Sequence, residues 1–231
     1  MSDTDSGSVD EAPVLDAYDL ASGYAGSPVW SQVDVTLYAG EVAFLVGPNG
    51  AGKTTLLKCL AGWMNPTAGE VRICGERMDG ASGALRTAIS FVPDVPAFYD
   101  DLTAGEHIEF VLRARRLRGE RHAEAEDLLR RFGIWEARDA FPQSFSRGMR
   151  QKLALIIALI NHPRLLLLDE PTGPLDPASR ELLGALIRSA VDAGTAVLMS
   201  CHHDLPGVTP DVVFKLDQGS VCEVKGYGLG A

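Results

Sequence analysis

Short apolar segments alternate with polar turns along most of the chain, and their lengths predict alternating strands and helices. The β-rich pattern typical of strands covers Val14–Leu20, Val29–Leu37, Glu41–Val46, Val71–Ile73, Ala88–Val92, Arg164–Asp169 and Thr195–Ser200. Helical patterns cover Lys53–Ala61, Gly148–Ile160 and Pro177–Val191. Strands that alternate with helices favour a mainly parallel sheet with crossover connections, so the predicted fold class is α/β.

A different pattern between Leu102 and Phe132 predicts an inserted group of helices. Thr103 and Glu106 have the spacing of a capping box, and two partly buried helical patterns follow. We therefore expect a helical insert at about residues 95–150. The insert contains a basic run interleaved with glutamates, which indicates either a solvated helix face or a contact with a membrane subunit or anionic lipid headgroups; the run consists of Arg113, Arg115, Arg116, Arg118 and Arg121.

The two ends of the pattern and the overall charge restrict the class of protein. Residues 1–13 are acidic and nearly free of apolar side chains, which predicts a disordered tail before a single domain at 14–231. With 21 Lys and Arg against 31 Asp and Glu, the net charge of −10 argues against a nucleic-acid partner. The longest apolar run, Leu153–Ile160, is far below the 18 or so residues of a membrane span, and no secretory signal opens the chain. We expect a soluble protein whose four scattered cysteines are reduced thiols.

One local motif predicts a phosphate-binding loop. A G-x-x-x-x-G-K-[ST] sequence follows the apolar strand at Val42–Val46 and precedes a helix, which is the context that this motif requires. Its glycines let backbone amides point at phosphate oxygens, Lys53 reaches the β- and γ-phosphates, and Thr54 offers a hydroxyl to Mg²⁺. The predicted nucleotide-binding residues of the loop are Gly47, Pro48, Asn49, Gly50, Ala51, Gly52, Lys53, Thr54 and Thr55.

A second apolar segment, Leu165–Glu170, ends in two acids. A carboxylate at the carboxyl end of a buried strand lies where open α/β sheets place their ligands. We predict that Asp169 holds Mg²⁺ through its water shell and that Glu170 orients and activates the attacking water.

The segment Ser144–Gln151, about 20 residues before Asp169, narrows the class. Together with the two motifs above it resembles the ABC transporter ATPase family, with Phe145–Met149 in the place of the Leu-Ser-Gly-Gly-Gln signature. The resemblance covers roughly residues 14–224. It implies a P-loop NTPase core, an N-terminal antiparallel β subdomain and an inserted α-helical subdomain.

The resemblance also implies a site shared between two subunits. In the family the signature completes the ATP site of a facing subunit, which gives Ser146 and Gly148 a role on the partner's nucleotide. Tyr24 has the position of an aromatic that stacks on adenine. His202 fits the switch histidine that contacts the γ-phosphate, although the neighbouring His203 leaves a second choice, and Gly173–Asp176 looks like the loop that touches the opposite subunit.

Three positions depart from the family pattern. Asp94 stands where the family usually has a glutamine; its oxygen could still bind Mg²⁺, but it adds negative charge beside two other acids. Arg147 replaces the first signature glycine, and Pro174 stands where a glycine is usual. The basic residues of the signature resemble the export-type branch of the family.

The resulting hypothesis is an ATP-binding and ATP-hydrolysing subunit that drives transport, in the export direction, through separate transmembrane permease subunits. ATP and Mg²⁺ are its cofactors, and a second ATPase subunit, identical or similar, is its partner. A groove near Asp94–Asp101 would pass the motion to the permease. This function implies a cytoplasmic protein at the inner face of the cell membrane. The alternatives are a soluble ABC ATPase that acts on ribosomes or DNA and a P-loop kinase.

Overall fold

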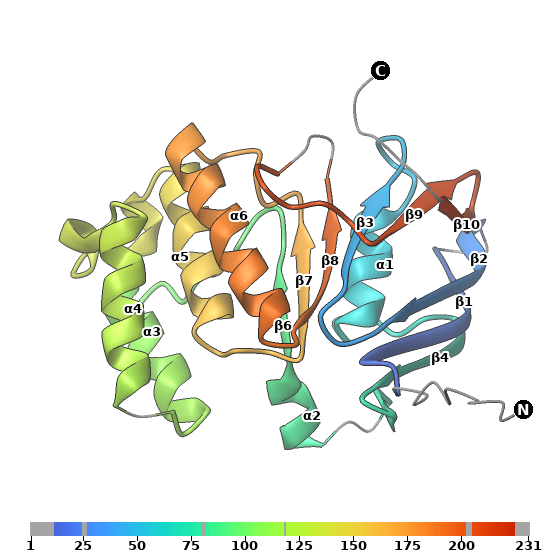
Figure 1. The fold of residues 1–231 in the computed structure, drawn as a ribbon, viewed down its shortest axis with the longest axis horizontal. Coiled ribbons are helices and arrows are strands. Elements are labelled where there is room, and N and C mark those ends of the chain that lie inside the picture. Colours follow the sequence, from blue (N-terminus) through green and yellow to red (C-terminus); the bar gives the residue numbers. More distant parts are fainter. Residues whose placement is uncertain (1–11, 25–26, 80–81, 118, 202–204, 225–231) are drawn as a thin grey trace, which may run out of the picture.

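The computed structural model describes residues 12–24, 27–79, 82–117, 119–201 and 205–224. Figure 1 shows these residues as a central sheet with a group of helices at one end and a second, β-rich part at the other. The sequence predicted this division into a core, an inserted helical subdomain and an N-terminal β subdomain.

The central sheet has six strands among the described residues, in the order β10-β9-β3-β8-β7-β6. Neighbouring strands from β9 to β6 run parallel, and only β10 is antiparallel, to β9. The strands are β3 (Val42–Val46), β6 (Ile89–Val92), β7 (Leu165–Asp169), β8 (Ala196–Ser200), β9 (Val212–Asp217) and β10 (Ser220–Val224). Strands β3, β7 and β8 are buried at every position, as near-continuous apolar runs predict for a sheet covered on both faces.

The N-terminal sheet is antiparallel and has the order β2-β1-β4-β5. Its strands are β1 (Leu15–Tyr24), β2 (Ser27–Leu37), β4 (Ala68–Ile73) and β5 (Glu76–Arg77). Trp30 on β2 is 1% exposed and belongs to the apolar cluster that this sheet shares with the core.

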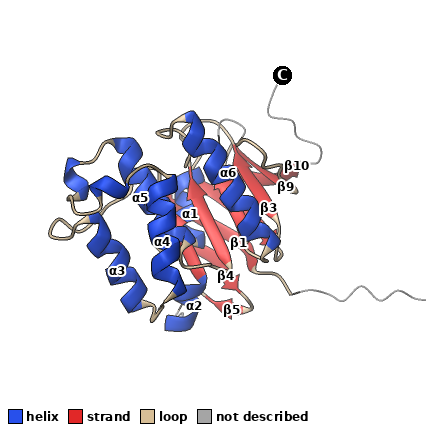
Figure 2. Ribbon diagram, turned by 60° about the vertical axis from the view of Figure 1, so that its left-hand side comes forward, coloured by secondary structure: helices blue, strands red, loops and turns tan. Residues whose placement is uncertain are grey.

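The two faces of the central sheet are covered by different helices, as Figure 2 illustrates. On β3, Ala43 and Leu45 point to the cluster that contains α1 (Lys53–Leu60) and the N-terminal sheet. The alternate residues Phe44 and Val46 point to the cluster of α5 (Arg147–Leu159) and α6 (Pro177–Asp192). Helices α1 and α5 therefore lie on opposite faces of the sheet.

The inserted subdomain contains α3 (Ala104–Ala114), α4 (Glu120–Arg131) and the short helices η1 (Trp135–Ala137) and η2 (Pro142–Ser144). Its start confirms the predicted capping box: Thr103 Oγ1 accepts from Glu106 N at 3.2 Å, and Glu106 Oε2 accepts from Thr103 N at 2.8 Å. Among the described residues, no helix combines the length and apolar character that a bilayer crossing requires.

Six elements of the described residues were not predicted: the strands β5, β9 and β10, the helix α2 (Gly83–Ala88), and the short helices η1 and η2. Helix α2 is six residues long, too short for a helical period to show, and it depends on Ser82 Oγ, which accepts from Leu85 N at 3.1 Å. The β9–β10 hairpin turns at Gln218 and Gly219, both with positive φ (48° and 80°). Such turns are usually signalled by Asn-Gly or Asp-Gly, and a glutamine in the first position conceals the signal.

Candidate nucleotide-binding site

The phosphate loop (Gly47–Thr55) follows β3 and includes the first turn of α1, and the side chain of Lys53 bonds to its backbone. The Nζ atom of Lys53 donates to the carbonyl oxygens of Gly47 at 2.8 Å and Pro48 at 3.3 Å, and the side chain is 6% exposed. Helix α1 begins without a side-chain cap, so amides of its first turn are free for an anion, and its dipole adds positive potential there. Thr54 is exposed at the same end. The loop therefore presents a cation and backbone donors in one place.

Two glycines of the phosphate loop are needed for packing against neighbouring strands, in addition to their predicted role in phosphate binding. A Cβ on Gly47 would lie 2.2 Å from the carbonyl oxygen of Leu216 on β9. A Cβ on Gly52, which has φ of 101°, would lie 2.6 Å from Val29 Cγ1 on β2. The loop is thus pressed between β9 and the N-terminal sheet, and a side chain at either position would displace it.

A buried acid ends β7 at the same edge of the sheet as this loop, with β8 between the two strands. Asp169 is 1% exposed, and its Oδ1 accepts from Ser200 Oγ at 2.7 Å. Its Oδ2 is buried and has no hydrogen-bond partner among the described residues. A buried carboxylate oxygen without a donor is unfavourable unless a ligand satisfies it, so this atom fits a cation or its bound water.

Ser200 was missed at the sequence level. It is fully buried at the last position of β8, in register with Asp169, and its Oγ also accepts from Glu170 N at 2.9 Å. Glu170 has a positive φ of 46°, a left-handed conformation that costs a non-glycine residue about 1–2 kcal/mol. Ser200 therefore bonds to the carboxylate of Asp169 and to the backbone of Glu170. The available signal was a hydroxyl at the end of an otherwise apolar strand, Ala196–Ser200.

The signature loop (Ser144–Arg150) opens α5 on the other face of the sheet. Ser146 is the N-cap, and its Oγ accepts from Met149 N at 3.2 Å while the residue stays exposed. A Cβ on Gly148 would lie 2.8 Å from the carbonyl oxygen of Pro174, so the signature loop packs directly against residues 173–176. The helix start again offers amides and a positive dipole end.

The structure separates the two predicted phosphate sites. Lys53 follows β3, whereas α5 packs along β6, and β8 and β7 lie between these strands. Three strand spacings amount to about 14 Å, and the helices that carry the two sites cover opposite faces. Figure 1 shows α1 and α5 correspondingly apart.

Residues 173–176 connect the acids to α6. Leu175 is buried at 3% exposure, and Asp176 caps α6 by accepting from Ser179 N at 2.9 Å. Asp176 also pairs with Lys152 of α5 at 2.7 Å. The Lys152 ammonium, followed by the Ser179 amide, holds the pKa of Asp176 well below its usual range.

Arg147 and Asp94, the two charged residues that depart from the family pattern, form an ion pair. Arg147 Nη2 and Asp94 Oδ1 are 2.7 Å apart, which places the predicted metal ligand Asp94 in an ion pair with the signature loop. The histidine at position 202 and its alternative at 203 lie outside the described residues. For Tyr24 the structure describes the backbone at the end of β1 and not the side chain.

Most of the predicted basic run forms contacts within the chain. Arg113 pairs with Glu109, and Arg121 pairs with Glu124. Arg115 donates to the carbonyl oxygens of Thr87 and Ile89, and burial lowers the pKa of its guanidinium. These contacts favour a structural role for the run over a lipid-binding one.

An apolar groove of about 780 Å³ lies between α1, the loop after β6 and the inserted helices. Trp63, Tyr99 and Phe110 line it while remaining 63%, 62% and 49% exposed, and Val95 is 71% exposed. The groove occupies the region that the sequence analysis assigned to a permease contact. Exposed large apolar side chains gathered in one groove mark an interaction site.

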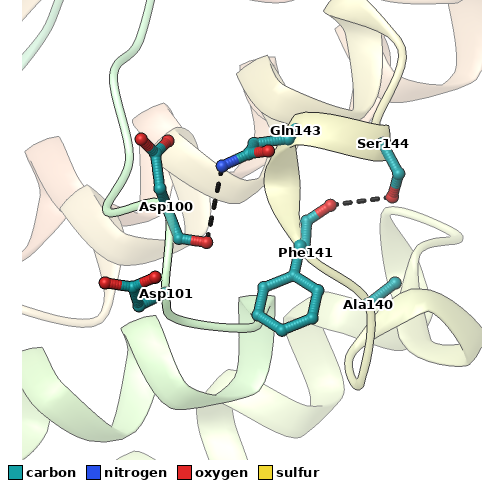
Figure 3. Close-up of a pocket in the computed structure, with 6 residues that line it drawn as sticks. All are labelled: Asp100, Asp101, Ala140, Phe141, Gln143 and Ser144. Atoms are coloured by element: carbon teal, nitrogen blue, oxygen red, sulfur yellow. Dashed lines mark hydrogen bonds between the residues drawn. The ribbon is translucent and has the colours of Figure 1, made fainter.

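A second, open pocket of about 530 Å³ lies next to this region (Figure 3). Asp100 and Asp101 line one side, and Phe141 and Ser144 line the other. Gln143 Nε2 donates to the Asp100 carbonyl at 3.5 Å, a long contact that joins the two sides. None of the predicted nucleotide-binding residues whose side chains the structure describes lines this pocket.

The phosphate loop, the buried aspartate and the parallel sheet together define a P-loop NTPase. The sequence matches the family model described as ABC transporter over residues 30–173. The chain belongs to the ABC transporter family and is one of its ATP-binding subunits, an ATPase.

Curated relatives and solved structures agree with this assignment. The chain is 33% identical over 190 residues to "ABC-type transporter ATP-binding protein EcsA" of Bacillus subtilis, covering 82% of this chain and 77% of the relative. It is 33% identical to "Daunorubicin/doxorubicin resistance ATP-binding protein DrrA" of Streptomyces peucetius, covering 87% of this chain and 62% of that protein. It is 34% identical to "Nod factor export ATP-binding protein I" of Cupriavidus metallidurans, over 82% and 63% respectively.

The fold is similarly close to structures of ATP-binding subunits. "Structure of ATP binding subunit of ABC transporter" superposes with a TM-score of 0.85 at 31% identity, covering 91% of this chain and 89% of the other. The dimeric ATP-binding cassette MJ0796, solved bound to ADP and Pi, superposes with a TM-score of 0.80 at 25% identity over 93% and 99%.

Proposed function

We propose that two copies of this chain, or one copy and a similar subunit, sandwich two ATP molecules head to tail and hydrolyse them to drive export through separate permease subunits. The observation that carries the proposal is the separation of the phosphate loop from the signature loop within one chain. Two anion-binding helix starts on opposite faces serve one nucleotide only if the second start comes from another subunit.

In each site one chain would supply the phosphate loop with Lys53 and the acids of β7. Lys53 would move its Nζ from the carbonyl oxygens of its own loop to the phosphates. Glu170 would accept a proton from the attacking water, and Ser200 would keep Glu170 and Asp169 in place. Such catalysis depends mainly on positioning and on neutralising charge in the transition state.

A magnesium ion fits this site because Asp169 Oδ2, at the same sheet edge as the phosphate loop, is buried without a donor among the described residues. Asp169 and the Thr54 hydroxyl would hold it, together with phosphate oxygens and water, which Mg²⁺ usually retains. When bound, the ion supplies charge neutralisation of the β- and γ-phosphates. Tyr24 beneath the adenine and His202 at the γ-phosphate remain part of the proposal.

The facing subunit would contribute Ser146 and Gly148. Ser146 is exposed and Gly148 half-buried, so both groups are accessible to a second molecule. The solved relative MJ0796 is dimeric with ADP and Pi, which supports the same assembly here. The names of DrrA and of the Nod factor protein refer to drug resistance and export, and they support the export direction.

The permease would dock an apolar segment in the groove lined by Trp63, Tyr99 and Phe110. This contact would hold the subunit at the cytoplasmic face of the membrane. Tyr99→Asp and Val95→Asp should abolish co-purification of an integral membrane protein from gently solubilised membranes, with ATP binding retained. Tyr38→Asp is the matched control, since Tyr38 is 40% exposed and does not line the groove. Loss of the membrane partner in the control as well would remove the groove from its assigned role.

Subunit complementation tests the shared site directly. Lys53→Ala damages the phosphate loop, whereas Ser146→Asp keeps the helix cap and adds a charge that repels phosphate. A head-to-tail dimer of the two variants contains one site with both halves intact, so mixing two inactive preparations should restore part of the ATPase activity. No gain on mixing, with both variants folded, would contradict the shared site.

Trapping the closed dimer provides an independent test. Glu170→Gln should bind ATP, turn it over at least about 100-fold more slowly, and accumulate as a dimer in sedimentation experiments with Mg-ATP. Glu181→Gln, which removes an exposed charge from α6, should behave as the wild type. Turnover near the wild-type rate in Glu170→Gln would remove Glu170 from its role.

A further inference from the structure

Arg147 and Asp94 form an ion pair that joins the signature loop to the loop after β6. Arg147 Nη2 lies 2.7 Å from Asp94 Oδ1, although 53 residues separate them in sequence. The Arg147 side chain is 59% exposed and that of Asp94 is 41% exposed. Both residues differ from what the signature and the glutamine position of the family usually contain.

Asp94 follows the strand that neighbours the one ending in two acids. It comes two residues after Val92, which pairs in register with Leu168 on the neighbouring strand. That strand ends in Asp169, and Glu170 follows, so three acidic residues lie at or just after two adjacent strand ends. A nucleotide at the phosphate loop would bring further negative charge to the same edge of the sheet, and unneutralised like charges there are unfavourable.

Arg147 also carries a charge in an electrostatically unfavourable position. It is the first residue of α5, where the positive end of the helix dipole disfavours a cation, and no acid lies in the first turn. Its guanidinium pairs with the carboxylate of Asp94, in the loop after β6, and not with an acid of its own helix. Each residue of the pair therefore compensates a local electrostatic penalty of the other.

The pair also determines how α5 lies on β6. Near the other end of the helix, Ser90 Oγ on β6 donates to the Ala158 carbonyl at 3.2 Å in a buried contact. Residue 90 contacts residue 158, and residue 94 contacts residue 147, so the chain direction of α5 is opposite to that of β6. One contact lies near each end of the helix. Ser146 and Gly148 flank Arg147, so the end joined by the ion pair is the one that faces the partner's ATP in the proposed dimer.

We propose that Arg147 is a positioning residue which neutralises Asp94 and thereby holds Ser146 and Gly148 in the orientation that binds the partner's nucleotide. Asp94 then acts as the anchor of the signature loop and not as a metal ligand. This inference rests on the proposed shared site, and it predicts that the effect of losing Arg147 depends on the charge at position 94.

The test is a double-mutant cycle in a Glu170→Gln background, read as the ATP concentration that gives half-maximal dimer. Arg147→Gln should raise this concentration about fivefold, the upper range for an exposed ion pair. Adding Asp94→Asn should return it to within about twofold of the reference, because the unpaired carboxylate is then absent. Arg147→Lys should keep part of the effect, and high salt should reduce the difference between the reference chain and the Arg147→Gln variant.

Arg150→Gln, one turn farther along α5, is the matched control and should not respond to the charge at position 94. A second readout is ATP affinity at protein concentrations too low for dimerisation, together with thermal unfolding of every variant. Additive effects of Arg147→Gln and Asp94→Asn would overturn the proposal. If the reference chain does not dimerise at all, the shared site fails, whereas coupling between positions 147 and 94 in ATP affinity would still support neutralisation of Asp94.

Discussion

The two halves of the proposed site are held in place by different forces. The phosphate loop follows a fully buried strand, and its Lys53 and the neighbouring Asp169 are 6% and 1% exposed. In the signature loop only Phe145 is buried, Ser144, Ser146 and Arg147 are exposed, and an exposed ion pair joins Arg147 to Asp94. Farther along α5, Lys152 is 14% exposed and pairs with the half-exposed Asp176.

This difference distinguishes the half of the site that one chain forms within itself from the half that it offers to a second subunit. Buried polar groups of the first half bond to each other, as Lys53 does to its own loop and Ser200 to Asp169. In the second half Ser146 is exposed and Gly148 is half-buried, so a facing subunit could reach both. Changes in the first half should therefore affect folding and nucleotide binding, and changes in the second half should affect assembly.

The largest effect is expected from Lys53→Ala. Loss of the only side-chain cation in the phosphate loop should reduce ATP turnover at least about 100-fold, as removal of one preorganised donor typically does. ATP hydrolysis and binding of a fluorescent nucleotide measure the loss, and thermal unfolding reports whether the chain remains folded. Undiminished hydrolysis would place the reactive nucleotide elsewhere.

Ser200→Ala tests whether the buried half depends on its hydroxyl. The change leaves the buried Asp169 carboxylate without its donor, which should lower the free energy of unfolding by about 2 kcal/mol. Ser90→Ala is the matched control: its hydroxyl is also buried but bonds to a neutral carbonyl, so we expect about 1 kcal/mol. Urea unfolding compares the two, and equal losses would show that the charge of Asp169 is not what makes Ser200 important.

Local motifs were predictable and contacts set by sheet register were not. The phosphate loop is a run of consecutive residues whose flanking strand and helix show in the same stretch of sequence, so its position between β3 and α1 follows from the sequence. Ser200 contacts Asp169 only because β8 and β7 pair in that register, 31 residues apart. Asp94 and Arg147 were each recognised as unusual, but their contact depends on how α5 lies along β6.

Gly148→Ala tests the packing of the exposed half. A Cβ there would lie 2.8 Å from the Pro174 carbonyl, so the signature loop or residues 173–176 must shift. Overpacking of this kind costs about 1–2 kcal/mol, partly offset by the better helix propensity of alanine. We expect dimer formation with Glu170→Gln to need about tenfold more ATP.

Gly83→Ala is the corresponding control in a helix away from the site. A Cβ at Gly83 meets nothing within 4 Å, and its φ is not positive. That variant should be as stable as the wild type or about 0.5 kcal/mol more stable. A dimerisation defect of equal size in both variants would mean that contact with Pro174 does not position the signature loop.

The smallest effect is expected at Asp176, which both caps α6 and pairs with Lys152. Asp176→Asn keeps a good cap and removes the charge, so it should cost less than about 1 kcal/mol for a half-exposed pair. Asp176→Ala removes both the cap and the charge and should cost about 1 kcal/mol more.

The contribution of the Asp176 charge to stability should also depend on pH. The pKa of Asp176 is lowered in the folded chain, so this contribution is complete above the unfolded pKa of about 3.9 and is lost as the pH falls toward the folded pKa. The stability difference between wild type and Asp176→Asn should therefore narrow from pH 7 to pH 3 in urea unfolding, and a difference that stays constant would show that the Lys152 pair contributes nothing to holding the exposed half.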